Sequence, residues 1–181
     1  MDNGLIPQRY AKALYKYALE HGQTTELYDL TKTVISSFED NPALQKTIAN
    51  PNIKVEDKER LLLAAAGKEA DEAYRRFVTL VADHGREEYF RPMMMAYRDI
   101  YRKENHISQA TITTAATLGE EERGKLHKLV EDAFKGSTLE FTESVNPDLI
   151  GGFVIDVDSV RMDASVSNEL EQLRQTLLRG K

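Results

Sequence analysis

Three aspartates near the C-terminus are the side chains best suited by type and spacing to do chemistry. Asp156 and Asp158 are two residues apart in a predicted strand, so both would share one strand face, and Asp163 follows closely. Carboxylate oxygens suit hard cations, so a small metal-dependent enzyme is one hypothesis. The calcium-loop pattern is missing, and no glutamate follows at the required distance. We therefore favour solvated edge and turn residues, and we expect no metal site.

The other residues with catalytic or ligand-binding potential form no known motif. Gly151-Gly152 precedes a predicted strand, whereas phosphate-binding glycines lie between a strand and a helix, so we interpret the pair as backbone geometry. No two of the histidines have metal-ligand spacing; they are His21, His84, His106 and His127. We expect no catalytic residue and no cofactor.

The composition excludes several classes of function. The chain has 181 residues, with 24 basic and 30 acidic side chains and a net charge of -6, which disfavours nucleic acid as a partner. It has no cysteine, which excludes a disulfide scaffold and thiolate catalysis. The first ten residues lack the apolar run of a signal peptide, and no apolar run approaches the roughly 20 residues that cross a bilayer. We expect no direct membrane insertion.

Apolar residues recur at helical spacing from residue 5 to about 104 and predict six short helices. Glycine caps or X-Pro steps separate them, at Gly22, Asn41-Pro42, Asn50-Pro51, Gly67 and Gly85. The sixth helix is expected over residues 87–103. Short helices with tight breaks indicate an antiparallel bundle.

The period changes after residue 105. Alternation of β-branched residues around Ile112 predicts a strand, and Thr117 with Glu120 matches a capping box at the start of a helix. Further strands are predicted around residues 139–145, 153–157 and 160–162, and Ser165 or Ser167 should cap a last helix. The predicted fold class is mainly α with a small α/β part. A six-helix N-terminal bundle (1-105) is followed by a small mixed α/β C-terminal domain (106-181).

Surplus apolar residues on two helices suggest an interaction surface. The first helix has a second apolar side, because Ala11, Tyr15 and Ala18 lie off the stripe of Tyr10, Ala13 and Tyr17. In the fifth helix Leu80 falls outside the main stripe. Two interpretations fit equally: a groove that receives another helix, or a small bundle that surrounds these helices on several sides.

Four segments resemble the delta (oligomycin-sensitivity-conferring) subunit family of rotary ATP synthases. They are QRYAKALYKYALEHG, NPALQKTIANPNIKVEDKERLL, FVTLVADHGREEYFRPMMMAYRDIYRKENHISQATITTAATL and NPDLIGGFVIDVDSVRMDASVSNELEQLRQTL, and together they cover nearly the whole chain. The last segment is the most specific, and its signature residues are Pro147, Leu149, Ile150, Gly151, Gly152, Phe153, Asp163 and Ser165. One departure is Glu87-Glu88, which stands where the family has apolar residues.

The resemblance implies a non-catalytic stator subunit that links the catalytic head of the ATP synthase to its peripheral stalk. The expected partners are the N-terminal helix of the alpha subunit, in a groove between the first and fifth helices, and the b-type stalk subunits on the C-terminal domain. The implied location is the cytoplasmic face of the cell membrane, as a peripheral part of the complex. The main alternative is a generic helical adaptor unconnected with ATP synthase.

Matching by segment gives the groove residues that the resemblance implies. They are Tyr10, Ala11, Leu14, Tyr17, Phe77, Leu80, Val81 and His84. We expect Tyr10→Asp or Leu14→Asp to leave the fold intact and to weaken binding of the head.

Overall fold

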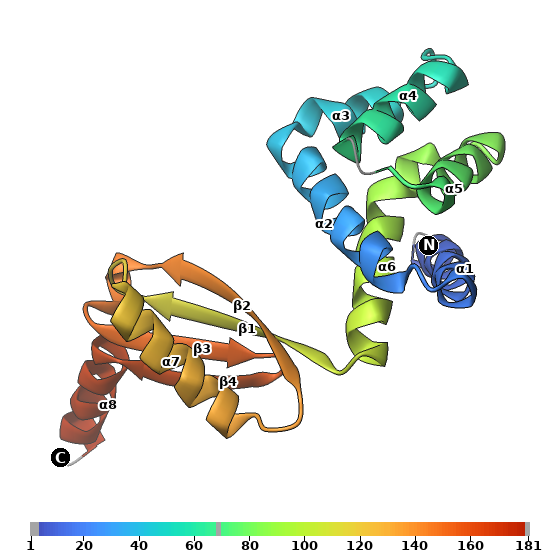
Figure 1. Cartoon of the computed structure of the whole chain (residues 1–181). Coiled ribbons are helices and arrows are strands. Elements are labelled where there is room, and N and C mark those ends of the chain that lie inside the picture. The colour runs from blue at the N-terminus through green and yellow to red at the C-terminus, as the bar shows by residue number, and fades with distance from the viewer. Residues whose placement is uncertain (1–3, 68–69, 180–181) are drawn as a thin grey trace. The chain divides into compact units, whose positions relative to one another are not determined.

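The computed structural model describes residues 4–67 and 70–179 (Figure 1). The chain divides into two compact units, Met1–Glu104 and Asn105–Lys181. Within the described ranges, no helix is long and apolar enough to cross a membrane.

The first unit is built from helices. They are α1 (Leu5–His21), α2 (Thr24–Asp40), α3 (Pro42–Ile48), α4 (Val55–Ala65), α5 (Glu72–Asp83) and α6 (Phe90–Glu104). Glycines in the left-handed conformation follow α1, α4 and α5, with φ values of 68° at Gly22, 68° at Gly67 and 59° at Gly85. The predicted breaks between the helices are therefore confirmed, and α6 packs against both α1 and α2.

Two tyrosines anchor the centre of this unit. The Tyr74 hydroxyl donates to the Leu62 carbonyl oxygen at 2.7 Å, and the Tyr97 hydroxyl donates to the Thr24 carbonyl oxygen at 3.1 Å. Burial raises the pKa of both hydroxyls, so each remains a protonated donor. Each buried polar group is thus satisfied by main chain from another helix.

The face of α1 that packs into the bundle is not the stripe of Tyr10, Ala13 and Tyr17. The buried residues are Pro7, Ala11, Leu14 and Ala18, whereas Ala13 is exposed and Tyr10 and Tyr17 are half-buried. Alanine on the buried stripe allows close approach of α1 to α6, because the distance between packed helices depends on the side chains at the contact. The tyrosine stripe instead lies beside α5, where Tyr10 meets Phe77 and Tyr17 meets Arg76.

The start of the sixth helix also differs from the prediction. Glu87–Tyr89 forms a 3-10 turn, η2, and α6 begins only at Phe90. The Lys58 Nζ of α4 lies 3.6 Å from the Glu87 carboxylate, and these side chains are only 10% and 5% exposed. A glutamate that departs from the family pattern is therefore buried against a lysine, and the tighter turn brings it there.

The second unit is a small mixed sheet with two helices. Its elements are β1 (Ile107–Thr114), α7 (Glu120–Ala133), β2 (Thr138–Val145), the 3-10 turn η3 (Pro147–Leu149), β3 (Gly152–Val157), β4 (Val160–Ser165) and α8 (Val166–Arg179). The strand order is β2-β1-β3-β4; β1 and β2 are parallel, and the other pairs are antiparallel. The predicted mainly α fold with a small α/β part is confirmed.

The core of the second unit lies between the sheet and α7, which crosses one face of it in Figure 1. Ala110 and Ile112 of β1 and Ile155 and Val157 of β3 pack there with Val130 of α7. The register places Ala110 opposite Val157 and Ile112 opposite Ile155, so these side chains share one face. The alternation predicted around Ile112 follows from the burial of this face of β1.

Candidate partner-binding surfaces

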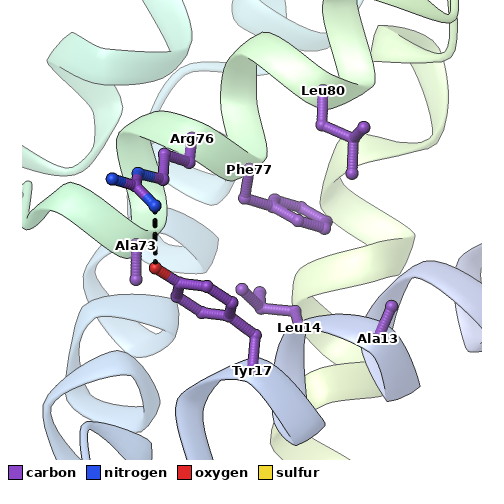
Figure 2. Close-up of a pocket in the computed structure, with 7 residues that line it drawn as sticks. All are labelled: Ala13, Leu14, Tyr17, Ala73, Arg76, Phe77 and Leu80. Atoms are coloured by element: carbon purple, nitrogen blue, oxygen red, sulfur yellow. Dashed lines mark hydrogen bonds between the residues drawn. The ribbon is translucent and has the colours of Figure 1, made fainter. Parts of the chain in front are cut away.

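The main candidate surface is a hollow of about 240 Å³ between α1 and α5 (Figure 2). Its lining is mostly apolar and consists of Ala13, Leu14, Tyr17, Ala73, Arg76, Phe77 and Leu80. The Arg76 guanidinium donates to the Tyr17 hydroxyl at 3.4 Å and forms an ion pair with Glu72. Its charge is therefore neutralised, and an apolar face on a partner would meet matching apolar walls. We call this hollow the α1–α5 groove.

Four of the eight predicted groove residues line this hollow: Leu14, Tyr17, Phe77 and Leu80. Tyr10 lies at one end, edge-on to the rings of Phe77 and His84, with centroids 6.3 Å apart in each pair. The exposed His84 ring holds its Nδ1 2.7 Å from the Leu80 carbonyl oxygen, at the end of α5. These two residues therefore border the groove without lining it.

Ala11 and Val81 are fully buried and do not line the groove, contrary to prediction. They belong to the packed core because their faces of α1 and α5 turn toward the bundle. Ala13, Ala73 and Arg76 also line the groove and were not predicted. Ala13 could have been found if the stripe with Tyr10 and Tyr17 had been assigned to the surface.

The depth of the groove decides which residues can be changed safely. Leu14 is only 4% exposed, so Leu14→Asp would bury a carboxylate in the bundle and destabilise it. This burial argues against the expectation that the variant leaves the fold intact. Leu80, at 43% exposure, forms the rim and can be replaced without opening the core.

The Gly151-Gly152 pair shapes the start of the β3–β4 hairpin. Gly152 has a φ of 71°, and a Cβ there would overlap the carbonyl oxygen of Ala164 on β4. The Gly151 carbonyl oxygen accepts a hydrogen bond of 3.1 Å from the main-chain N–H of Val166, the first residue of α8. The interpretation of this pair as backbone geometry is confirmed, most firmly at Gly152.

The signature residues around this pair form the joint between the hairpin and α8. Pro147 and Leu149 belong to η3, which contacts α8, and Ile150 follows with a φ of 65°. Phe153 packs at the border of the sheet core. Most of the signature residues of the last segment therefore lie at this one joint.

Asp163 and Ser165 cap the last helix. The Asp163 Oδ1 accepts hydrogen bonds from the Ser165 main-chain N–H at 3.0 Å and from its hydroxyl at 2.6 Å. The Ser165 Oγ in turn accepts from the Asn168 N–H at 3.2 Å, so Ser165 is the capping residue. The hydrogen bonds from Ser165 lower the pKa of Asp163.

The three aspartates do not form a cation site. β3 ends at Val157, so Asp158 lies in the turn with a φ of 48°, and the prediction that it shares a strand face with Asp156 is wrong. Asp158 accepts a hydrogen bond from the Gln109 N–H at 3.3 Å, and Asp156 lies 3.8 Å from the Arg161 guanidinium. In the described part of the chain, no three acidic or histidine side chains gather to hold a metal ion.

A second candidate surface is the exposed apolar stripe of α8, which consists of Leu170, Leu173 and Leu177. These leucines are 52%, 60% and 78% exposed, although their spacing is that of a packed helix face. Val160 and Met162 on the edge strand β4 are exposed as well. Exposed apolar residues along one helix face are typical of interaction surfaces, so the α8 stripe is a candidate for one.

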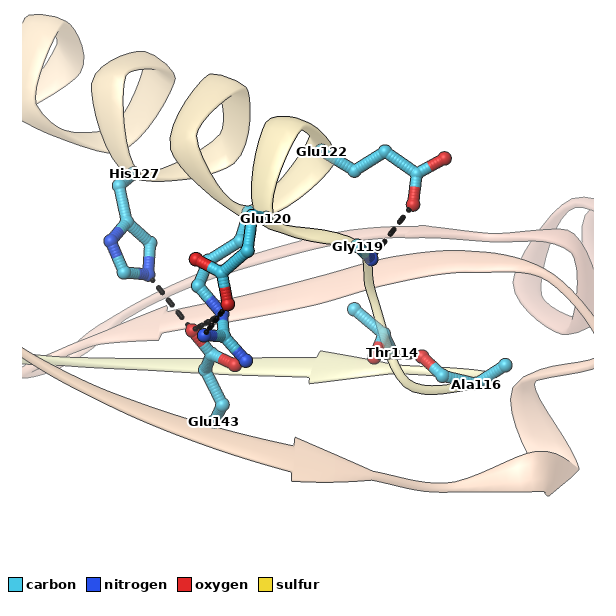
Figure 3. Close-up of polar contacts among 8 residues, drawn as sticks. Thr114, Ala116, Gly119, Glu120, Glu122, His127 and Glu143 are labelled. Carbon is cyan, nitrogen blue, oxygen red and sulfur yellow. Dashed lines mark hydrogen bonds and ion pairs between the residues drawn. The ribbon is translucent and has the colours of Figure 1, made fainter.

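The N-terminus of α7 is capped differently from the prediction (Figure 3). Gly119 is the capping residue, and its main-chain N–H donates to the Glu122 carboxylate at 3.2 Å. The predicted pair of Thr117 with Glu120 is wrong because the helix begins at Glu120, two residues later than that pair requires.

A polar cluster joins α7 to β2, also visible in Figure 3. The Glu143 carboxylate lies 3.1 Å from the His127 Nε2 and 2.9 Å from the Arg123 Nε, and Arg123 also pairs with Glu120. The His127 ring stacks on Phe141 with a centroid separation of 4.0 Å. The cluster holds the helix on the sheet.

Comparison with known proteins identifies the family. The family model for the ATP synthase delta (OSCP) subunit matches residues 6–177. A Phocaeicola vulgatus protein named ATP synthase subunit delta is 37% identical over 176 residues, covering 97% of this chain and 95% of that protein. One of the same name from Parabacteroides distasonis is 37% identical over 182 residues, covering 100% of both chains.

A solved structure shares the fold. A chain of the Toxoplasma gondii mitochondrial ATP synthase hexamer matches with a TM-score of 0.71 and 20% identity, covering 95% of this chain and 97% of that one. The resemblance inferred from the four segments is confirmed by the family match and by the curated relatives. The chain belongs to the ATP synthase delta (OSCP) subunit family.

Proposed function

We propose that this chain, a non-catalytic subunit of the ATP synthase peripheral stalk, connects the head to the stalk through its two units. The first unit receives the N-terminal helix of an alpha subunit in the α1–α5 groove. The second unit holds the C-terminal part of the b-type stalk subunits. In a bacterial cell the connector works at the cytoplasmic face of the membrane, as a peripheral part of the complex.

The observation that carries the proposal is the apolar groove between α1 and α5. Leu14, Phe77 and Leu80 supply an aliphatic and aromatic lining, and the neighbouring Arg76 has its charge satisfied within the chain. A groove of this kind suits the apolar face of an amphipathic helix. Aromatic anchors such as Phe77 and Tyr17 are the residue types on which tight interfaces depend.

The second unit supports the stalk contact through α8. Leu170, Leu173 and Leu177 form a stripe that no other part of the described chain covers, which suits a helix of a coiled stalk. A stator contact must dissociate slowly under torque, and affinity differences among related interfaces lie mostly in the dissociation rate. A nanomolar contact corresponds to roughly -12 kcal/mol.

The test measures binding of a synthetic peptide containing the first 25 or so residues of the alpha subunit from the same organism. Isothermal titration calorimetry compares the full chain with its Leu80→Asp variant. Docking would bury the 43% of Leu80 that is still exposed, and fully burying a leucine yields about 1.5–3 kcal/mol. Loss of the burial energy of this exposed part alone weakens peptide binding roughly threefold to tenfold. The cost of desolvating the new carboxylate weakens binding further.

The matched control is Leu19→Asp, which changes an exposed leucine of α1 outside the groove lining. It should bind the peptide as the unaltered chain does. Equal binding by all three proteins would contradict docking of the alpha subunit in the groove. A parallel assay with b-type stalk subunits uses Leu173→Asp, and retention of full stalk binding would exclude α8 as the contact.

A further inference from the structure

A second hollow extends the groove beyond Tyr10. It is lined by Leu5, Ile6, Arg9, Tyr10 and Arg86. Tyr10 touches Phe77, which lines the first hollow, so the two hollows lie end to end along α1 with Tyr10 between them. From Ile6 to Tyr17 the helix rises roughly 17 Å, which is about three turns of an occupant helix.

The two hollows together form one seam along α1, and the two ends of this seam differ in charge. At the Tyr17 end the Arg76 guanidinium is paired with Glu72. At the other end are Arg9, which is exposed, and Arg86, which is half-buried. Neither of these has a carboxylate partner in the part of the chain that the structure describes. The seam is therefore apolar along its middle and cationic at one end only.

We infer that the helix docked in the α1–α5 groove carries a carboxylate beyond one end of its apolar face, which pairs with Arg9 and Arg86 and fixes the direction of the helix. This inference rests on the proposed function. An apolar stripe fits an apolar groove in either direction, so burial alone leaves the direction open. Guanidinium groups bind carboxylates through paired, directional hydrogen bonds, and charge complementarity sets register and direction at interfaces.

The charge distribution also selects among the occupants of the groove. A helix with a basic end over Arg9 and Arg86 would bring like charges together, which costs affinity. A helix with its acidic end over the Tyr17 end would meet Arg76 already neutralised by Glu72. One direction and one charge pattern are thus favoured over the others.

The test uses the alpha-subunit peptide and versions in which the acidic residues of either end are replaced by their amides. The full chain is compared with the double variant Arg9→Gln/Arg86→Gln. Two partly exposed pairs each change affinity about twofold to fivefold, so the double variant should bind roughly fourfold to twenty-five-fold more weakly at low salt. Removal of the acids from one peptide end should give the same loss, and the two losses should not add.

The control is Lys12→Gln, which removes a positive charge from the same helix. Lys12 is exposed, lines neither hollow, and lies about 200° around α1 from Tyr10. It should change affinity by less than about twofold, since a single exposed charge contributes little. Circular dichroism confirms that each variant is folded before its binding is interpreted.

The outcomes separate the two proposals. If Leu80→Asp weakens peptide binding but Arg9→Gln/Arg86→Gln does not, the groove stands and the inference is overturned. If the unaltered chain does not bind the peptide, the proposed function fails first. Sedimentation that shows a dimer dispersed by Leu80→Asp would assign the groove to a second copy of the chain and overturn both.

Discussion

The buried Lys58–Glu87 ion pair between α4 and η2 allows a quantitative test of how the bundle is held together. The Nζ and the carboxylate are 3.6 Å apart, and their side chains are 10% and 5% exposed. Removal of one partner leaves an uncompensated buried charge, which typically costs about 3–5 kcal/mol. Lys58→Met or Glu87→Leu alone should therefore lower the free energy of unfolding by about this amount.

The double variant Lys58→Met/Glu87→Leu should recover most of the loss. Replacing a buried ion pair by apolar residues of similar volume is often neutral, because the cost of desolvating both charges offsets their attraction. We expect the double variant to lie within about 1 kcal/mol of the unaltered chain. A coupling energy of several kcal/mol between the two positions follows.

The assay is urea unfolding followed by tyrosine fluorescence. All 8 tyrosines lie between Tyr10 and Tyr101, so this signal reports the first unit alone. With a slope of about 2 kcal/mol per molar urea, a loss of 3–5 kcal/mol lowers the midpoint by roughly 2 M. The reasoning is refuted if each single variant costs less than about 1 kcal/mol, or if the double variant equals the sum of the singles.

Two further predictions concern the second unit, whose unfolding is the part of the far-UV circular dichroism transition that tyrosine fluorescence does not follow. Gly152→Ala should destabilise it by at least about 1–2 kcal/mol, because the left-handed φ penalises a side chain and its Cβ would overlap the Ala164 carbonyl oxygen. Its matched control is Gly124→Ala in α7, which meets open space and should stabilise by up to about 1 kcal/mol; equal effects at both glycines would contradict this account. Hydrogen bonds from Ser165 lower the pKa of Asp163 in the folded chain, so its contribution to stability is complete above the ordinary carboxyl pKa of 3.8 and is lost as the pH falls through the lowered value. Asp163→Asn should therefore reduce the fall in the free energy of unfolding below about pH 4 and leave its pH dependence near neutrality unchanged. The same fall below pH 4 in both proteins would contradict a contribution of ionised Asp163 to stability.

The elements that the sequence predicted well are those set by local chemistry. Glycine and proline ended helices where they were expected to, because only glycine enters the left-handed region easily and the residue before proline leaves the helical region. Alternation of β-branched residues located β1, since one face of this strand is buried against α7. The two-glycine hairpin was recognised for the same local reason.

The errors arise where tertiary contacts decide. On α1 both stripes are apolar enough to be buried, and only packing against α6 selects the one with Ala11 and Ala18. The start of α6 depends on Lys58, which lies far away in sequence, so periodicity could not reveal the turn at Glu87. Asp158 was assigned to a strand because a two-residue alternation continues past Val157, and its left-handed φ has no signal in side-chain type alone.

The candidate groove was only partly predictable. Leu80 stood out by its excess apolar character and Phe77 was implied by the family resemblance, whereas Ala13 and Ala73 have small side chains that carry no sign of a cavity until the helices are placed together. The cationic end was also missed, because Arg9 and Arg86 are distant in sequence and meet only through the antiparallel arrangement of α1 and α5.

The direct passage of β4 into α8 has a mechanical consequence. Ser165 ends the strand and Val166 begins the helix, so a pull on α8 enters the sheet through the main chain. β4 pairs with β3 from Gly152 opposite Ser165 to Val157 opposite Val160, and these hydrogen bonds run across the strands. A load along β4 is therefore shared in shear by the whole hairpin instead of opening one bond at a time. The load is thus carried by the main chain and by the hydrogen bonds between β3 and β4, and the leucine stripe of α8 remains available for contacts.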